Sequence, residues 1–350
     1  MGKVRTFFRR VKKLPRYIAG RCKGLIVNIK NIFKRARVEG RDFEPRRKEF
    51  GLKVAFAAFF DRVFPPTKHP FYIKSIEKYV DKFMRPIVEK YQNFNEGLKT
   101  FQFKKIPVWC CWWQGEDKMP EIVKLCNDRL KSLIPEDAEL HMLTEKNYQE
   151  YMQLPDYILK KFEEGKIGVA HLTDILRVSL LAKYGGFWID STVFLSHEFP
   201  VEFIKNDYYT QRMYDPVKHV REACKGRWSG FLSGGRPNCI VFLLLRDAFF
   251  EWFKYHDTVI DYVMYDYFLL SGYKRVSAIK LLIDAVPDNN TGVFDMCYLL
   301  YKPYTKELYY KLTRDTHLHK LTYKIDLYKE TADGQETLYG YLLKEQYKER

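Results

Sequence analysis

The sequence predicts an α/β fold, in which one globular domain follows a basic helical segment at the N-terminus. Between residues 106 and 325, short apolar runs alternate with segments of helical spacing, as expected when helices pack on a sheet. With 46% hydrophobic and 17% aromatic residues, the chain of 350 residues is able to bury one large core. The formal net charge of +16 is concentrated in residues 1–48, which hold 17 Lys and Arg against 3 Asp and Glu. The other 302 residues hold 43 Lys and Arg against 41 Asp and Glu, so this part of the chain is nearly neutral.

Residues 1–48 have the pattern of two basic amphipathic helices that are broken at Pro15. Apolar residues recur at helical spacing on both sides of the proline, and Lys and Arg lie between them. Such helices bind anionic membrane surfaces, where apolar side chains insert and basic side chains meet the headgroups. The alternatives are a basic arm that binds nucleic acid and a helix that docks on its own domain. No apolar run approaches about 18 residues, so no transmembrane helix is predicted.

Residues 49–105 are predicted to form a helical lead-in that is broken at Pro65 and Pro66. The seven cysteines are scattered along the chain, and no two have C-x-x-C spacing. An odd and unpatterned set of cysteines in apolar surroundings indicates reduced thiols in a cytosolic protein.

The first strand is predicted at residues 106–113, an apolar run that ends in Trp112 and Trp113. Gln114 and Gly115 begin the turn at its carboxyl end. A tryptophan in this position is most often a core residue, although its flat face can also stack on a ligand. The next predicted elements are a helix at 119–133, a strand at 139–144 and helical structure at 147–164.

Residues 166–195 contain the motif around which the domain is predicted to be organised. A helix ends at Gly185 and Gly186, because glycine adopts the left-handed C-cap conformation without steric cost. The apolar residues 187–189 and 193–195 are then expected to form a buried strand.

Three charged residues interrupt this apolar unit: Asp174 and Arg177 on the helix and Asp190 on the strand. Taken alone, Asp174 and Arg177 have the spacing of a surface ion pair, and Asp190 is typical of a turn. Taken together, they indicate a ligand site, because open α/β sheets bind ligands at the carboxyl ends of their strands.

Downstream, the run 256–267 mixes aromatic residues with Asp261 and Asp266, which is typical of sugar sites but also of amphipathic helices. Residues 317–324 offer imidazole and ammonium groups, and the alternative is a solvated basic tail. The other predicted elements are strands at 208–213 and 228–233, a loop at 234–238, a helix at 239–254 and a charged, frayed helix at the C-terminus.

The residues A-H-x-[ST]-D-x-x-R, followed by Y-G-G-x-W-x-D, resemble the sugar-nucleotide-binding region of retaining glycosyltransferases. More narrowly, they resemble the capsular polysaccharide synthesis family, which is related to mannosyltransferases and to glucosylating bacterial toxins. The upstream run IPVWCCWWQGEDKMPEIVKLC and the downstream run HLHKLTYK extend the resemblance. It implies a GT-A, Rossmann-like glycosyltransferase domain at 106–325, preceded by the membrane-surface segment 1–48 and the lead-in 49–105 and followed by a helical tail at 326–350.

The function that this resemblance implies is transfer of a sugar from a UDP- or GDP-linked donor, with retention of anomeric configuration. The acceptor would be a polysaccharide or lipid-linked oligosaccharide of the cell surface. The catalytic residues would be Asp174, Arg177 and Asp190. The donor would be bound by Trp112, Trp113, Gln114, Gly115, Gly186, Ser191, Thr192, His319 and Lys320. The acceptor side would hold Ser233, Gly234 and Asp266.

The resemblance also implies that Asp190 binds Mn²⁺ or Mg²⁺. The second acid of the family's Asp-x-Asp motif is replaced by Thr192, so we expect weak metal binding in the absence of nucleotide. The expected location is the inner face of the plasma membrane, with the protein bound peripherally from the cytoplasm. Two other classes are a sugar-nucleotide- or membrane-binding protein of degenerate transferase fold and a nucleic-acid-binding protein. The nearly neutral charge after residue 48 argues against nucleic acid as a partner.

Overall fold

A computed structural model describes most of the chain, with side chains from residue 31 to residue 345. The described residues are 16–64, 69–94, 101–199, 207–215, 217–219 and 222–346. The chain divides into two compact units, residues 1–79 and residues 80–350. The helix predicted before Pro15 lies outside the described residues. Within the described part of the chain, no helix is both long enough and apolar enough to cross a membrane.

The N-terminal unit is built on α2 (Arg16–Phe50) and α3 (Leu52–Val63). Gly51 separates the two helices with a φ of 84°, a backbone conformation that favours glycine. The helices pack against each other through Phe43 and Phe59, whose ring centroids are 6.0 Å apart. The helix after Pro15 therefore extends beyond the predicted basic segment, and its last turns form part of a packed helix pair.

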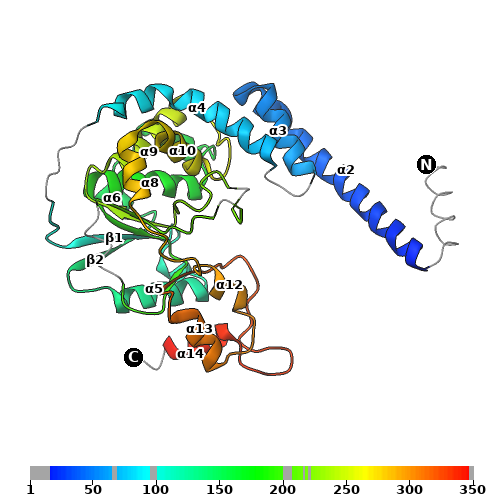
Figure 1. The fold of residues 1–350 in the computed structure, drawn as a ribbon, viewed down its shortest axis with the longest axis vertical. Coiled ribbons are helices and arrows are strands. Elements are labelled where there is room, and N and C mark those ends of the chain that lie inside the picture. Colours follow the sequence, from blue (N-terminus) through cyan, green and yellow to red (C-terminus); the bar gives the residue numbers. More distant parts are fainter. Residues whose placement is uncertain are drawn as a thin grey trace. The chain divides into compact units, whose positions relative to one another are not determined.

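The C-terminal unit contains a mixed sheet of five strands. These are β1 (Ile106–Cys111), β2 (Ala138–Leu143), β3 (Gly186–Ile189), β5 (Tyr208–Thr210) and β6 (Leu232–Gly235), in the spatial order β2-β1-β3-β6-β5. Figure 1 shows β1 and β2 side by side. β1 is parallel to β2 and β3, and β6 is antiparallel to both β3 and β5. A second, two-stranded antiparallel sheet joins β4 (Val193–Leu195) to β7 (Leu318–Lys320). The predicted α/β class is confirmed.

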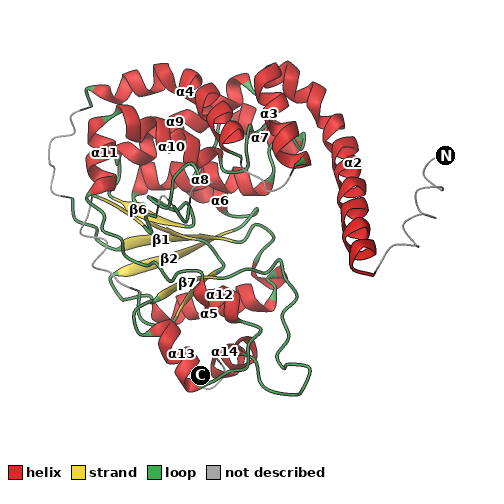
Figure 2. Ribbon diagram, turned by 45° about the vertical axis from the view of Figure 1, so that its right-hand side comes forward, coloured by secondary structure: helices red, strands yellow, loops and turns green. Residues whose placement is uncertain are grey.

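The helices after residue 80 are α5 (Glu121–Leu133), α6 (Tyr148–Tyr151), α7 (Asp156–Glu163), α8 (Val169–Tyr184), α9 (Ile240–Tyr255), α10 (Met264–Arg275), α11 (Ser277–Asp284), α12 (Asp295–Leu299), α13 (Lys306–Thr313) and α14 (Leu338–Gln346), with a 3₁₀ turn at Glu116–Lys118. Helix α4 (Pro70–Gln92) begins in the first unit and ends in the second. Figure 2 shows α8, α9 and α10 on one side of the larger sheet and α5 and α12 on the other, so helices enclose it from both faces.

The sequence-based boundaries need several corrections. The single buried strand expected from residues 187–189 and 193–195 is two strands, β3 and β4, which belong to different sheets. The strand predicted at 228–233 begins only at Leu232. Residues 234–235, predicted as a loop, belong to β6, and the segment predicted as helical at 147–164 is two helices that are separated near Pro155. The terminal helix α14 is also not a frayed charged helix. Its apolar side chains are buried with those of α5 and α12 in one core cluster: Leu338, Tyr339, Leu342 and Leu343.

Helix α8 ends where the sequence predicts, because two glycines allow an abrupt change of direction into β3. Gly185 and Gly186 have φ values of 67° and 87°. A Cβ atom on Gly186 would lie 2.0 Å from the carbonyl oxygen of Pro107. Glycine is therefore required here, and it lets β3 approach β1 closely enough to pair with it.

Candidate functional site

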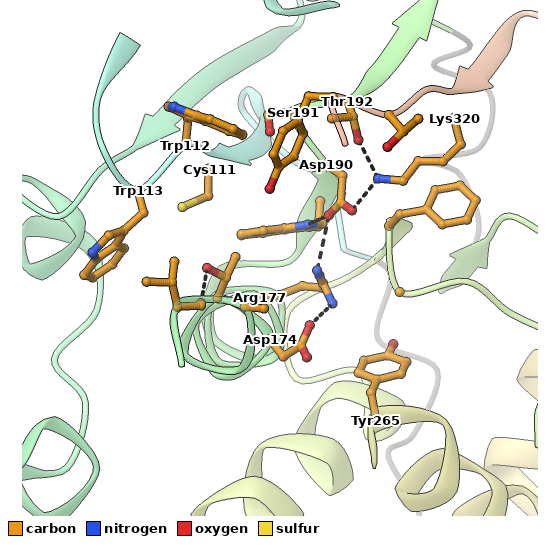
Figure 3. Close-up of a pocket in the computed structure, with 18 of the residues that line it drawn as sticks. Cys111, Trp112, Trp113, Asp174, Arg177, Asp190, Ser191, Thr192, Tyr265 and Lys320 are labelled. Carbon is orange, nitrogen blue, oxygen red and sulfur yellow. Dashed lines mark hydrogen bonds and ion pairs between the residues drawn. The ribbon is translucent and has the colours of Figure 1, made fainter. Parts of the chain in front are cut away.

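A cleft of about 590 Å³ opens at the carboxyl ends of β1 and β3 (Figure 3). These strands are parallel neighbours, so Trp112 and Asp190, which follow them, meet at the same edge of the sheet. The volume lies in the range of roughly 300–1,000 Å³ that is usual for small-molecule sites. The predicted site residues that line the cleft are Trp112, Trp113, Gln114, Asp174, Arg177, Asp190, Ser191, Thr192, Asp266 and Lys320.

Arg177 joins the two carboxylates of the cleft. Its Nη1 lies 2.6 Å from Oδ1 of Asp174, and its Nη2 lies 3.2 Å from Oδ1 of Asp190. The guanidinium also lies 5.0 Å from the ring centroid of Trp188 and 6.0 Å from that of Tyr265. Only 8% of the Arg177 side chain is exposed, so the pair with Asp174 is not a surface ion pair.

Burial and charge act in opposite directions on Asp174. Removal from water raises the pKa of this carboxyl, because burial disfavours its charged form, and the neighbouring Arg177 opposes the rise only in part. The pKa of Arg177 is raised despite its burial, since Asp174 and Asp190 both favour the charged guanidinium. The two residues therefore depend on each other for a stable charged state.

Asp190 is the most heavily hydrogen-bonded of the three predicted catalytic residues. Its Oδ1 accepts from Arg177 and from Nε1 of Trp188 at 2.9 Å, and its Oδ2 accepts from Nζ of Lys320 at 2.7 Å. Burial alone would raise the pKa of Asp190, but the charges of Lys320 and Arg177 outweigh burial and lower it to about 2. The residue is an anion under all physiological conditions.

Lys320 reaches this position through the two-stranded sheet. β7 pairs with β4 so that Lys320 lies opposite Val193, close to the turn that contains Thr192. The ammonium group lies 2.6 Å from Oγ1 of Thr192, in addition to its contact with Asp190 (Figure 3). Side chains alternate along a strand, so Lys320 faces the cleft and His319 faces away from it.

Two tryptophans form the opposite wall of the cleft. Trp112 donates from Nε1 to the carbonyl of Lys118 at 3.3 Å, and its ring meets that of Tyr323 edge-on at 5.3 Å. Trp113 packs beside Tyr148, with ring centroids 5.2 Å apart. Both indoles are held by these neighbours and are only half-buried, so part of each apolar surface is open to a ligand.

Five predicted site residues do not line the cleft. His319 is fully buried on the other face of β7, and burial lowers its pKa to about 3. Ser233 and Gly234 are buried within β6, where they pair with β3. Gly186 begins β3, at the end of the strand opposite the cleft, and Gly115 forms the N-cap of the turn after Gln114. In this structure these residues serve packing and turn geometry.

Several residues that line the cleft were not singled out from the sequence. Trp188 and Tyr265 hold Arg177 from two sides, and Gly230 leaves room for it, since a Cβ there would lie 3.1 Å from Nη1. The ring of Phe231 lies 5.4 Å from the Lys320 ammonium. Trp188 belongs to the Y-G-G-x-W-x-D motif and Tyr265 belongs to the aromatic run 256–267, so both could have been identified as candidate site residues from the sequence. The sequence contains no comparable signal for Gly230.

The side chains around Asp190 do not match a divalent-metal site. No group of three His, Cys, Asp or Glu residues in the described part of the chain could hold a metal ion. Asp190 is the only carboxylate of the 190–192 turn, and Lys320 already spans the distance from it to Thr192. Mg²⁺ and Mn²⁺ prefer several oxygen ligands, whereas this turn offers one carboxylate that is already paired with two cations.

Comparison with known proteins identifies the family. The family model described as capsular polysaccharide synthesis protein matches residues 59–342, which include every residue of the cleft. A search of curated proteins found no match. The matched range covers most of the chain, from α3 to α14. The chain therefore belongs to the capsular polysaccharide synthesis protein family.

Proposed function

We propose that the protein is a retaining glycosyltransferase of GT-A type, which transfers a sugar from a nucleotide-sugar donor during capsular polysaccharide synthesis. The observation that carries the proposal is the cleft at the carboxyl ends of β1 and β3. There, aromatic surfaces, a permanently ionised carboxylate and two cations converge within one volume of nucleotide-sugar size. Family membership supports the biosynthetic role in capsule formation.

The roles of the residues follow from their chemistry. Trp112 or Trp113 offers an apolar face on which the base of a UDP- or GDP-linked donor stacks. Asp190 accepts hydrogen bonds from the hydroxyl groups of the ribose and the sugar. Arg177 fixes the carboxylates of Asp174 and Asp190 at 2.6 and 3.2 Å, so it acts mainly as a positioning residue.

In the transfer step, the bond between the sugar's C1 and the phosphate oxygen breaks, and its electron pair leaves with the nucleoside diphosphate. The acceptor hydroxyl oxygen forms the new bond to C1 on the same face, and its proton passes to the departing phosphate. Negative charge therefore grows on the diphosphate in the transition state. Lys320, on the same side of the cleft as Asp190, is placed to stabilise that charge.

The acceptor side of the cleft is assigned to residues 262–266, which include the first turn of α10. Asp266 lines the cleft and accepts a hydrogen bond from Nε1 of Trp228 at 3.0 Å, which fixes its carboxylate. Tyr262 and Tyr265 line the same wall. Aromatic rings beside a carboxylate suit a glycan, because the rings contact C–H faces and the carboxylate accepts from hydroxyl groups.

We further propose that the N-terminal unit binds an anionic membrane surface, where a lipid-linked acceptor would be presented. Helix α3 has exposed apolar residues at intervals of four, on one side of the helix, namely Leu52, Phe56 and Phe60, and the exposed Phe64 follows its last residue. This stripe belongs to the same unit as the basic helix α2, and the combination of apolar and basic side chains suits a membrane interface.

Deleting residues 1–30 tests the membrane proposal and retains the part of α2 that holds the Phe43–Phe59 contact with α3. The deletion removes 10 Lys and Arg and no Asp or Glu. Sedimentation with phosphatidylserine vesicles at low salt should fall strongly, whereas sedimentation with neutral vesicles should be weak before and after the deletion. Undiminished sedimentation with the anionic vesicles would refute the assignment of the basic segment.

A thermal-shift screen of UDP- and GDP-linked sugars tests the proposed site. A bound donor should raise the melting temperature of the wild type, because it binds only the folded state. The shift should be lost in Asp190→Asn and retained in Asp333→Asn, which removes a carboxylate of a distant surface turn. No shift with any donor would contradict the proposal. A shift without sugar transfer would favour the alternative of a degenerate sugar-nucleotide-binding protein.

A further inference from the structure

We propose that the ammonium group of Lys320 takes the place of the divalent cation in this site, so that the protein binds the donor diphosphate without metal. This inference rests on the proposed function and makes it more specific. It names the group that neutralises the diphosphate, and it departs from the metal dependence that the resemblance implies.

The first argument is position. The 190–192 turn presents an acid at its first residue and a hydroxyl at its third, the two positions that hold acids in the Asp-x-Asp pattern that the sequence resembles. Here the Lys320 ammonium lies 2.7 Å from Oδ2 of Asp190 and 2.6 Å from Oγ1 of Thr192. One cationic group therefore already contacts both residues (Figure 3).

The second argument is charge. A second acid at position 192 would give the turn two negative charges, which suit a dication. With Thr192 at this position, the turn has one negative charge, that of Asp190, which matches the single positive charge of Lys320. The other oxygen of Asp190 is shared by Arg177 and Trp188. Arg177 is also paired with Asp174, so the two carboxylates Asp174 and Asp190 are already balanced by the two cations Arg177 and Lys320. A dication beside Asp190 would add positive charge to this balanced cluster, which is unfavourable.

The third argument is that Lys320 retains a hydrogen-bond donor for the ligand. An ammonium group has three N–H donors, and Asp190 and Thr192 accept two of them. Lys320 lines the cleft, and its ammonium group lies over the ring of Phe231, another lining residue, at 5.4 Å from the ring centroid. The contacts with Asp190 and Thr192 fix the ammonium at the wall of the cleft, and the third N–H is available for a phosphate oxygen.

The test is calorimetric titration of the full-length protein with UDP and with GDP, in excess EDTA and in MnCl₂. The wild type should bind one of the two nucleotides with a Kd that EDTA changes by less than about twofold. Lys320→Met should weaken binding by roughly 10–100-fold, the usual cost of losing a charged hydrogen bond. Lys311→Met removes the same charge from an exposed position on α13 and should leave the Kd unchanged.

A charge swap makes the test specific. In Lys320→Met combined with Thr192→Asp, the cation is gone and the second acid is restored, so nucleotide binding should return only in MnCl₂. Lys320→Arg, which keeps the charge, should bind without metal. Melting temperatures of all variants identify any that fail to fold, and the wild-type EDTA titration does not depend on the variants.

Three results would count against the inference in distinguishable ways. Nucleotide binding by the wild type that requires Mn²⁺ would refute the metal-free site and leave the proposed function standing. Tight binding of Mn²⁺ alone to the nucleotide-free wild type would likewise refute the metal-free site and leave the proposed function standing. Absence of binding to UDP, GDP and all their sugar conjugates, with and without metal, would refute the proposed function together with the inference.

Discussion

Replacing Arg177 with Gln should cost far more stability than its spacing from Asp174 suggests. A surface pair three residues apart on a helix contributes only about 0.2–1 kcal/mol. Arg177, however, is only 8% exposed and bonds two carboxylates, Asp174 at 2.6 Å and Asp190 at 3.2 Å. Removing one member of a buried ion pair leaves uncompensated charge and costs roughly 3–5 kcal/mol. We expect a loss in this range for Arg177→Gln.

Urea denaturation, followed by tryptophan fluorescence, measures this loss as a change in the free energy of unfolding. The matched control is Arg314→Gln, because Arg314 pairs with Asp315 at 2.7 Å but the two side chains are 56% and 75% exposed. The control should cost less than about 1 kcal/mol. Adding Asp174→Asn to Arg177→Gln should recover part of the loss, since one unpaired carboxylate is removed. A cost below about 1 kcal/mol for Arg177→Gln would refute the buried network.

Three further predictions address other parts of the chain. The pKa of Asp190 is lowered to about 2 from an ordinary value near 4, so its ionised carboxylate should contribute roughly 2 kcal/mol to the free energy of unfolding above pH ~4. This contribution should be lost as the pH falls toward 2. If urea titrations show that Asp190→Asn and the wild type lose stability equally in acid, the prediction is contradicted. Burial raises the pKa of Cys111 to about 12, so iodoacetamide at pH 8 should modify this thiol about a thousandfold more slowly in the native than in the urea-unfolded protein. Mass spectrometry of the labelled peptide measures both rates. Similar rates would mean that the thiol is exposed. Phe56→Ser with Phe60→Ser should weaken binding to phosphatidylserine vesicles at least tenfold through lost apolar insertion, and unchanged sedimentation would remove α3 from the membrane surface.

The sequence was sufficient to predict the edge of the sheet at which the cleft lies. Trp112 lies at the end of one predicted strand and Asp190 on another. Such apolar runs form parallel strands in α/β folds, and the carboxyl ends of parallel strands lie at one edge of the sheet. The glycines at 185 and 186 likewise marked the end of α8 correctly, because the steric demand of a positive φ is local.

The parts that sequence reasoning missed depend on pairing between distant segments. His319 and Lys320 are adjacent, and only the register of β7 on β4 decides that Lys320 faces Asp190 while His319 is buried. The strand was too short for its alternation to be recognised. In the same way, Asp174 and Arg177 have the spacing of a surface ion pair but are largely buried. Their burial comes from Trp188 and other residues outside α8, which the spacing within the helix does not indicate.

The most direct test of the proposed activity is sugar transfer itself. Purified protein is incubated with UDP- and GDP-sugars labelled in the sugar, together with capsular oligosaccharide or lipid-linked oligosaccharide, and both the released nucleoside diphosphate and the labelled acceptor are quantified. We predict equal amounts of the two products from one donor, at a rate at least ~100-fold lower in Asp190→Asn, in which the fixed anion of the donor site is lost. Absence of labelled acceptor with every donor, or the same rate in Asp190→Asn as in the wild type, would contradict the assignment of this cleft as a glycosyltransferase active site.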